Sequence, residues 1–276
     1  MTPPPPVVAV ADLAALSPAP VLVDVRWYLD GRSGADAHDR AHLPGAVFLD
    51  LDAWLTGPSG GPDDGRHPLP SPERFTEGLA RAGVADDDHV VAYDDAGGRV
   101  AARLVWLLRV TGRRASLLDG GTDAWPGPWA HGPVHRARTT PEVRPWPGGL
   151  LVDLTAATAP ESVLLDAREA ARYRGEHEPV DPRPGHVPGA VNLPATTALG
   201  PDGRLLPPDR LRAGFDAVGA GAAADVVASC GSGVTACFTL LVRQHAGLPP
   251  GRLWPGSYSG WTAAADRPVV TGDRPR

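Results

Sequence analysis

Lysine is absent from the 276 residues, and all 26 side chains counted as lysine plus arginine are arginine. Schiff-base chemistry, including catalysis with pyridoxal phosphate, requires a lysine amine and is therefore excluded. An excess of positive charge is also lacking, because the formal net charge is -6. We expect no basic surface on which a nucleic acid could release counterions, so DNA and RNA are poor partners.

Cysteine is scarce, since only Cys230 and Cys237 are present. If one helix carries both, their Cα atoms lie about 10 Å apart, beyond the roughly 7 Å that a disulfide allows. Two cysteines make no zinc site, no metal or organic cofactor is implied, and a reducing compartment fits. Apolar runs long enough to span a bilayer are missing, and Met1–Pro6 lacks the features of a secretory signal. We therefore expect a cytoplasmic protein without a membrane partner.

An internal repeat is the main feature that the sequence does contain. An apolar run at 21–26 precedes His42-Leu-Pro-Gly-Ala-Val47, and a similar run at 163–168 precedes His186-Val-Pro-Gly-Ala-Val191. The match continues with His89-Val-Val-Ala-Tyr93 against Asp225-Val-Val-Ala-Ser229. Helices are expected after these strands, at about 99–110 and 234–245. Short apolar strands that alternate with helices are typical of parallel sheets.

The repeat predicts an α/β fold with two domains, each a parallel sheet flanked by helices. A stretch rich in proline and arginine, within 132–149, lacks apolar periodicity and is the natural linker. We expect an N-terminal domain at 1–137, a linker at 138–149 and a C-terminal domain at 150–276.

The two halves differ after the third strand of each repeat. The first half has Asp94-Asp-Ala-Gly-Gly98, whereas the second has Cys230-Gly-Ser-Gly-Val-Thr235. A cysteine between a parallel strand and a helix lies where backbone N–H groups converge and the helix dipole stabilises a thiolate. Glycines let the loop wrap closely around the sulfur. The predicted cradle of N–H donors consists of Gly231, Gly233, Val234 and Thr235, while Cys237, two turns into the helix, is expected in the core.

These motifs together resemble the tandem-domain rhodanese family, and the loop Cys230–Ala236 looks like that of the 3-mercaptopyruvate sulfurtransferases. The resemblance extends from about Val21 to Trp261. It implies an enzyme in which Cys230 carries one sulfur atom as a persulfide, and in which the N-terminal loop has an acidic residue, here Asp94. A related loop in cysteine phosphatases is one residue longer and closes on an arginine, whereas here Thr235 is followed by alanine. Phosphatase activity is therefore not expected.

The residues beside the cysteine bear on the sulfur donor. Thiosulfate-preferring relatives resemble one another in having basic residues there, but this chain has Gly231 and Ser232. Loss of sulfur from 3-mercaptopyruvate leaves a pyruvate enolate that must be protonated. The resemblance implies a Ser-His-Asp relay for this step, made here of Ser232, His67 and Asp52. We therefore expect 3-mercaptopyruvate as the donor.

An anionic donor also needs a positive anchor. Arg172 matches the substrate arginine of the family, and a second arginine is expected shortly after it, with Arg183 as the first choice and Arg174 as the alternative. The expected acceptor is cyanide or a thiol, such as that of a thioredoxin-like protein. Two other functions stay open: a thiosulfate sulfurtransferase with the same nucleophile, and a non-catalytic sulfur carrier or interaction module.

Overall fold

The structure, a computed structural model, describes residues 3–275 and divides into two compact units. Unit 1 comprises the described residues up to Gly57, together with Leu69–Pro147 and Gly200–Leu205. Unit 2 comprises Pro58–Pro68, Gly148–Leu199 and the described residues from Leu206 onward. The change of unit after Pro147 falls within the linker predicted at 138–149. The loop Pro58–Pro68 belongs to unit 2, so the histidine at position 67 lies in the same unit as the cysteine loop.

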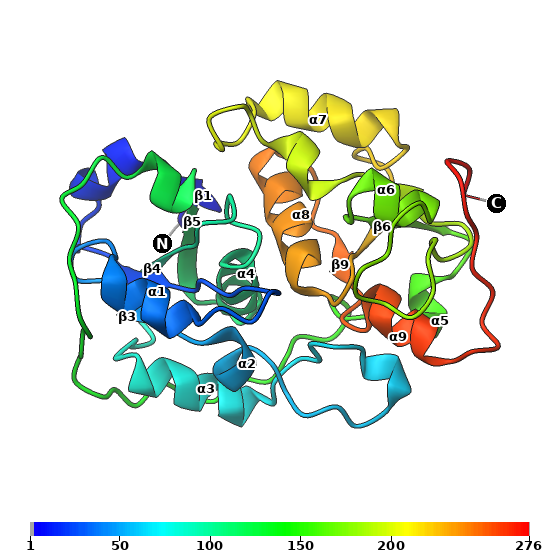
Figure 1. Ribbon diagram of the computed structural model, residues 1–276. Helices are drawn as coiled ribbons and strands as arrows, with labels where there is room; N and C mark the ends of the chain where they lie inside the picture. The colour runs from blue at the N-terminus through cyan, green and yellow to red at the C-terminus, as the bar shows by residue number, and fades with distance from the viewer. Residues whose placement is uncertain (1–2, 276) are drawn as a thin grey trace. The chain divides into compact units, whose positions relative to one another are not determined.

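Unit 1 contains a parallel sheet of five strands in the order β1-β5-β4-β2-β3. The strands are β1 (Val7–Val8), β2 (Val21–Asp24), β3 (Val47–Phe48), β4 (His89–Tyr93) and β5 (Arg114–Leu118). The helices are α1 (Gly34–Arg40), α2 (Leu51–Trp54), α3 (Pro72–Arg81) and α4 (Ala102–Val110), with 3-10 turns η1 (Val10–Ala15) and η3 (Gly121–Ala124). Helix α4 packs on β4 and β5, and α2 packs on α3 (Figure 1).

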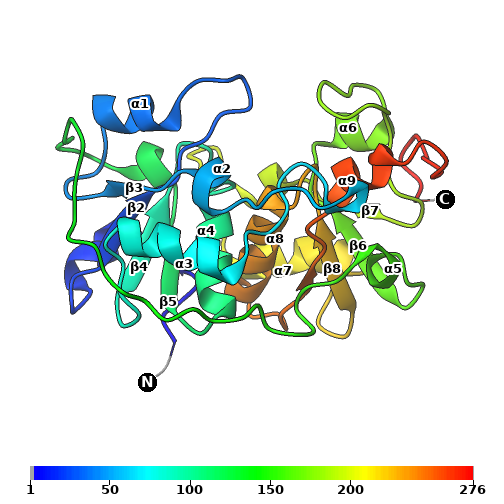
Figure 2. The ribbon, with the colours of Figure 1, turned by 90° about the horizontal axis from the view of Figure 1, so that it is seen from below.

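Unit 2 contains a parallel sheet of four strands in the order β7-β6-β8-β9. The strands are β6 (Ser162–Asp166), β7 (Val191–Asn192), β8 (Asp225–Ser229) and β9 (Arg252–Leu253). The helices are α5 (Leu154–Ala157), α6 (Ala170–Arg174), α7 (Pro208–Ala217), α8 (Val234–His245) and α9 (Ser257–Ala263), with 3-10 turns η2 (Pro62–Asp64) and η4 (Ala195–Ala198). Helices α7 and α8 lie on one side of the sheet and α5 on the other (Figures 1 and 2).

The two sheets share one topology, because β2, β3, β4 and β5 have the same neighbours as β6, β7, β8 and β9. Their central strands are buried on both faces, as continuous apolar runs predict for parallel strands. The core of unit 2 joins Ala157 of α5 to Trp254 and Tyr258. The predicted α/β fold with two repeated parallel sheets is therefore confirmed. Within residues 3–275, no helix has both the length and the apolar character needed to cross a membrane.

Helix α8 has the predicted bounds, whereas the helix expected at 99–110 begins only at Ala102. The residues before it turn around the fully buried carboxylate of Asp94. The Asp94 carboxylate accepts four backbone hydrogen bonds of 2.7–2.8 Å, from the N–H groups of Ala96, Gly98, Val100 and Ala101. Burial raises the pKa of Asp94, and these four donors oppose the rise. Unit 1 thus surrounds the carboxyl group of Asp94 with backbone donors at the end of β4.

Candidate active site

Cys230 directly follows β8, at the point where α8 is about to begin, and its side chain is 4% exposed. The N–H group of Gly233 donates a hydrogen bond of 3.1 Å to Cys230 Sγ. Gly233 has a φ of 79°, and a Cβ at this position would lie 2.5 Å from the carbonyl oxygen of Pro255. Both the backbone angle and the lack of space require glycine here. The loop therefore bends tightly enough to place a backbone donor on the sulfur.

Helix α8 begins directly after this loop. Val234 and Thr235 begin the helix, and N–H groups in a first turn have no acceptor within their own helix. The helix dipole adds partial positive charge at this end. In unit 1, the corresponding loop holds the carboxylate of Asp94 with four N–H groups. In both repeats the loop therefore directs backbone N–H groups at the side chain that follows the strand.

The first turn of α9 holds the cysteine loop from the other side. The Cys230 N–H donates to Ser257 Oγ at 3.2 Å, and Ser257 has a φ of 50°, which is uncommon outside glycine. The N–H groups of Tyr258 and Ser259 donate to the carbonyl oxygens of Cys230 and Gly231 at 3.0 and 2.9 Å. The sequence of Leu253–Ser257 corresponds to that of Leu117–Gly121 in the first half, but this match gives no sign of these contacts. They fix the position of the nucleophile independently of α8.

The loop Pro58–Pro68 reaches the cysteine loop by packing against the start of α9. A Cβ on Gly256 would lie 2.1 Å from the carbonyl oxygen of Asp63, so the two backbones touch directly. The N–H group of Arg66 donates to Ser259 Oγ at 2.9 Å. The end of this loop is therefore fixed to the same helix turn that holds the cysteine.

His67, at the end of this loop, lies against Ser232 of the cysteine loop. The His67 Nδ1 and Ser232 Oγ atoms are 2.7 Å apart, and both side chains are buried. The tautomer of the imidazole decides which of the two atoms donates. Two members of the predicted relay are thus in hydrogen-bond contact. Asp52 lies in unit 1, where its Oδ2 accepts a bond of 2.8 Å from Trp27 Nε1, and its place in the relay stays a prediction.

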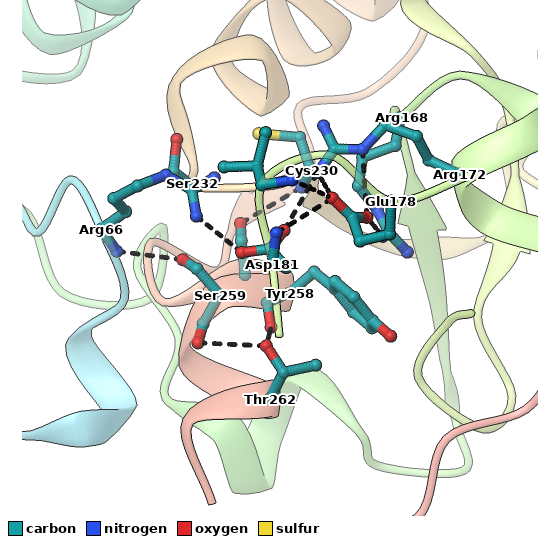
Figure 3. A network of polar contacts seen from close by, with 12 residues as sticks. Arg66, Arg168, Arg172, Glu178, Asp181, Cys230, Ser232, Tyr258, Ser259 and Thr262 are labelled. Atoms are coloured by element: carbon teal, nitrogen blue, oxygen red, sulfur yellow. Dashed lines mark hydrogen bonds and ion pairs between the residues drawn. The ribbon is translucent and has the colours of Figure 1, made fainter. Parts of the chain in front are cut away.

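Arg66 and Arg172 form a guanidinium pair that one carboxylate holds together (Figure 3). Asp181 Oδ1 accepts a bond of 2.6 Å from Arg66 Nη1, and Asp181 Oδ2 accepts one of 3.0 Å from Arg172 Nη2. A Cβ on Gly231 would lie 3.2 Å from Arg66 Nη2 and 3.7 Å from Arg172 Nη1. These two nitrogens are therefore next to the cysteine loop. Arg172 was predicted from the sequence, but Arg66 was not. Its position directly before His67 is the feature of the sequence that could have indicated it.

Glu178 forms a second carboxylate behind Arg172. It accepts bonds of 3.1 and 2.6 Å from Arg172 Nε and Nη2, and Arg168 Nη1 lies 3.3 Å away. Burial alone would raise the pKa of Glu178, but the Arg172 bonds and the N–H groups of Asp181 and Val180 outweigh it and lower this pKa. Glu178 is therefore charged at neutral pH, and it fixes the orientation of the Arg172 guanidinium.

The structure places the other two arginine candidates elsewhere. The Nη groups of Arg183 donate to the carbonyl oxygens of Ala264, Ala265 and Arg267, so this guanidinium holds the chain at the end of α9. Arg174 binds Glu176 at 2.6 and 2.8 Å. Beside Arg172 the structure places Arg66 instead, which comes from a distant part of the sequence.

Cys237 is fully buried in α8, and its Sγ donates to the carbonyl oxygen of Gly233 at 3.4 Å. It lies in the core, as its position in an apolar helix predicts, and neither cysteine forms a disulfide. Among residues 3–275, no three His, Cys, Asp or Glu side chains are grouped in a way that could hold a metal ion.

Comparison with known proteins agrees with this geometry. Residues 9–127 and 152–264 each match the model of the rhodanese-like domain. The chain belongs to the rhodanese family. It is 43% identical over 277 residues to the "Probable 3-mercaptopyruvate sulfurtransferase" of Pseudomonas aeruginosa, with 94% of this chain and 95% of that protein covered.

Two further relatives cover almost the whole chain. "Putative thiosulfate sulfurtransferase SseB" of Mycobacterium tuberculosis is 37% identical, with 96% of each protein covered. The crystal structure of SseA from Escherichia coli, described as a 3-mercaptopyruvate sulfotransferase, is 31% identical, with 92% of this chain and 99% of that chain covered and a TM-score of 0.78. The curated relatives are named as sulfurtransferases, so this rhodanese is an enzyme that transfers sulfur, and the non-catalytic carrier is set aside.

Two glycine replacements in the loop should have different effects. In Gly231→Ala the new Cβ contacts only the movable ends of the Arg66 and Arg172 side chains. We therefore expect the KM for the donor to rise about tenfold, which is the effect of losing one charge-assisted hydrogen bond. The melting temperature should stay unchanged. In Gly233→Ala the positive φ and the Pro255 carbonyl should lower the free energy of unfolding by about 2 kcal/mol or more. Steady-state kinetics and urea unfolding measure both effects. An unchanged KM in Gly231→Ala would remove the arginine pair from donor binding.

Proposed function

We propose that this sulfurtransferase takes a sulfur atom from 3-mercaptopyruvate onto Cys230 and passes it to cyanide or a thiol. The observation that carries the choice of donor is the 2.7 Å contact between His67 Nδ1 and Ser232 Oγ. Ser232 lies two residues from the nucleophile, where a proton source serves only a donor whose leaving group must be protonated. A pyruvate enolate is such a leaving group, and sulfite is not.

In the first step, the Cys230 thiolate attacks the sulfur atom of 3-mercaptopyruvate. A sulfur–sulfur bond forms, the carbon–sulfur bond breaks, and its electron pair stays with the CH2 carbon as a pyruvate enolate. Cys230 then carries a persulfide, in which the Gly233 N–H contacts Sγ, the inner sulfur. The N–H groups of the first turn of α8 are proposed to stabilise the charge on the outer sulfur. An acceptor thiolate or cyanide attacks that outer sulfur and releases the Cys230 thiolate, which completes a two-step covalent cycle.

The enolate takes up a proton from the Ser232 hydroxyl, and His67 returns a proton to Ser232 through Nδ1. The burial of both side chains keeps this hydrogen bond away from competing water. Asp52 is proposed to stabilise the imidazolium form of His67, the task that an aspartate has in a Ser-His-Asp triad. The cysteine is then the nucleophile, while the serine acts as the acid.

The donor carboxylate is proposed to bind Arg66 Nη2 and Arg172 Nη1 above Gly231. Support comes from the two nitrogens' distance to the loop and from their missing hydrogen-bond partners among residues 3–275. Two guanidiniums on one carboxylate give charge-assisted bonds that also fix its orientation. Arg66 takes the place for which the sequence offered Arg183.

Thiosulfate is the second candidate donor, because SseB of Mycobacterium tuberculosis carries that activity in its name. The same nucleophile would attack the outer sulfur of thiosulfate and release sulfite. Against it stand the neutral Gly231 and Ser232 beside the cysteine. The Ser232–His67 contact would then have no proton to deliver.

We further propose a cytoplasmic location and a small thiol or a thioredoxin-like protein as the natural acceptor. The two free cysteines support a reducing compartment. The net charge of -6 argues against nucleic acid as a partner.

Replacement of each cysteine separates the carrier of sulfur from the core thiol. After treatment with 3-mercaptopyruvate, the intact mass of the wild type and of Cys237→Ser should increase by about 32 Da, one sulfur atom, and Cys230→Ser should show no increase. A persulfide on Cys237, detected by mapping the modified peptide, would contradict the assignment of the nucleophile.

Replacement of the relay residues should affect the two donors unequally. Ser232→Ala and His67→Ala should each lower kcat for 3-mercaptopyruvate by about 10²–10⁴-fold, the usual effect of losing a general acid. The double variant should lose little more than either single variant, because the residues act as a unit. Turnover of thiosulfate should change far less. Equal losses for both donors would show that these residues only shape the loop.

A further inference from the structure

Asp181 is the carboxylate in Figure 3 that contacts both arginines of the donor site. Its side chain is 1% exposed. It binds Nη1 of Arg66 and Nη2 of Arg172, while Glu178 binds the Nε of Arg172 and shares its Nη2. Arg66 Nε, Arg66 Nη2 and Arg172 Nη1 have no hydrogen-bond partner among residues 3–275, and the last two of these nitrogens lie next to Gly231.

The charges of this network balance. Three guanidiniums, Arg66, Arg168 and Arg172, are joined by ion pairs to three carboxylates, Asp166, Glu178 and Asp181. Three positive and three negative groups give a formal charge of zero. The site therefore offers directed N–H groups to an anion without an excess of positive charge. The electrostatic attraction between a site and an anion grows with the charge of each. Neutralising the site therefore weakens the binding of a donor with two negative charges more than the binding of a donor with one.

We propose that Asp181 is a specificity-determining residue that neutralises the Arg66–Arg172 pair and thereby favours a donor with a single carboxylate over dianionic thiosulfate. The proposal deepens the proposed function and rests on its assignment of Arg66 and Arg172 to donor binding. The neutral Gly231 and the carboxylate of Asp181 act in the same direction. Gly231 provides no basic side chain beside the cysteine. Asp181 neutralises part of the positive charge of Arg66 and Arg172.

Because Asp181 is buried, its charge acts strongly on the neighbouring guanidiniums. Water screens an exposed carboxylate strongly, but a buried one acts on its neighbours through a medium of lower polarity. Asp181 contacts the two guanidiniums directly, so its charge lies one guanidinium away from a bound donor. A purely structural role, in which Asp181 only keeps the two like charges side by side, would affect every anionic donor alike.

The test compares donors across variants that differ in charge. Asp181→Asn keeps the shape of the side chain and one oxygen acceptor but leaves the site with one positive charge. We expect the ratio of kcat/KM for thiosulfate to that for 3-mercaptopyruvate, with cyanide as acceptor, to rise at least about tenfold, which corresponds to about 1.4 kcal/mol. Arg66→Gln makes the site negative by one charge and should shift the ratio in the opposite direction.

Glu176→Gln is the matched control. It removes one negative charge from the same segment, but Glu176 is exposed and pairs with Arg174 instead of the donor site. Its donor ratio should stay within about twofold of the wild type, as expected for a screened surface charge. Thermal unfolding of each variant confirms that the compared proteins are folded.

The proposal is overturned if Asp181→Asn changes both donors by the same factor, or if Glu176→Gln shifts the ratio equally. If Asp181→Asn does not fold, the donor ratio of Arg66→Gln is the remaining test. A donor ratio of Arg66→Gln equal to that of the wild type also overturns the proposal. The choice of donor by the wild type is a separate measurement. A wild-type preference for thiosulfate would refute the proposed donor, while the shift between variants would still decide the role of Asp181.

Discussion

The convergence of backbone N–H groups at the end of a buried parallel strand is the constraint on which both repeats depend. In unit 1 four N–H groups hold the carboxyl group of Asp94. In unit 2 the same place holds Cys230, with a Gly233 N–H on its sulfur and α8 beginning beside it. The donors are fixed by the fold before any sulfur arrives, so little reorganisation is needed when charge develops. One loop is thus permanently filled, and the other can accept sulfur and release it.

Three kinds of group surround the cysteine, and each has a different task in the proposed reaction. The Gly233 N–H contacts the sulfur, while in the proposed mechanism the Ser232–His67 pair moves a proton and Arg66 with Arg172 binds the carboxylate of the donor. The loop that carries His67 and Arg66 and the turn that holds Cys230 both pack on the start of α9. This short helix therefore sets the distances between groups that are far apart in the sequence.

The sequence predicts most of the fold, because strand and helix signals are local. The runs at 89–93 and 225–229 are the observed β4 and β8, and α8 covers 234–245 as its apolar pattern indicates. The late start of α4 was missed, since a side chain that binds nearby N–H groups competes with the helix and leaves no signal in apolar periodicity.

The site could be predicted only where a motif marks it. Cys230, Ser232, His67 and Arg172 lie in motifs, and the structure places His67 and Arg172 next to the loop that carries Cys230 and Ser232. Arg66, Asp181 and Glu178 depend on how the loop Pro58–Pro68 packs on α9, which no single stretch of sequence records. The choice of Arg183, with Arg174 as the alternative, followed from a loose match to the family, and the guanidinium of Arg183 binds backbone carbonyl oxygens at the end of α9.

The central claim is that a fixed anion site and a proton source act together on a donor that leaves as an enolate. The most direct test is the kcat/KM of the wild type for 3-mercaptopyruvate and for thiosulfate, measured on one preparation with cyanide as acceptor. We expect a preference for 3-mercaptopyruvate of about tenfold or more, because only this donor uses the proton that Ser232 and His67 can supply. Equal efficiencies, or a preference for thiosulfate, would contradict it.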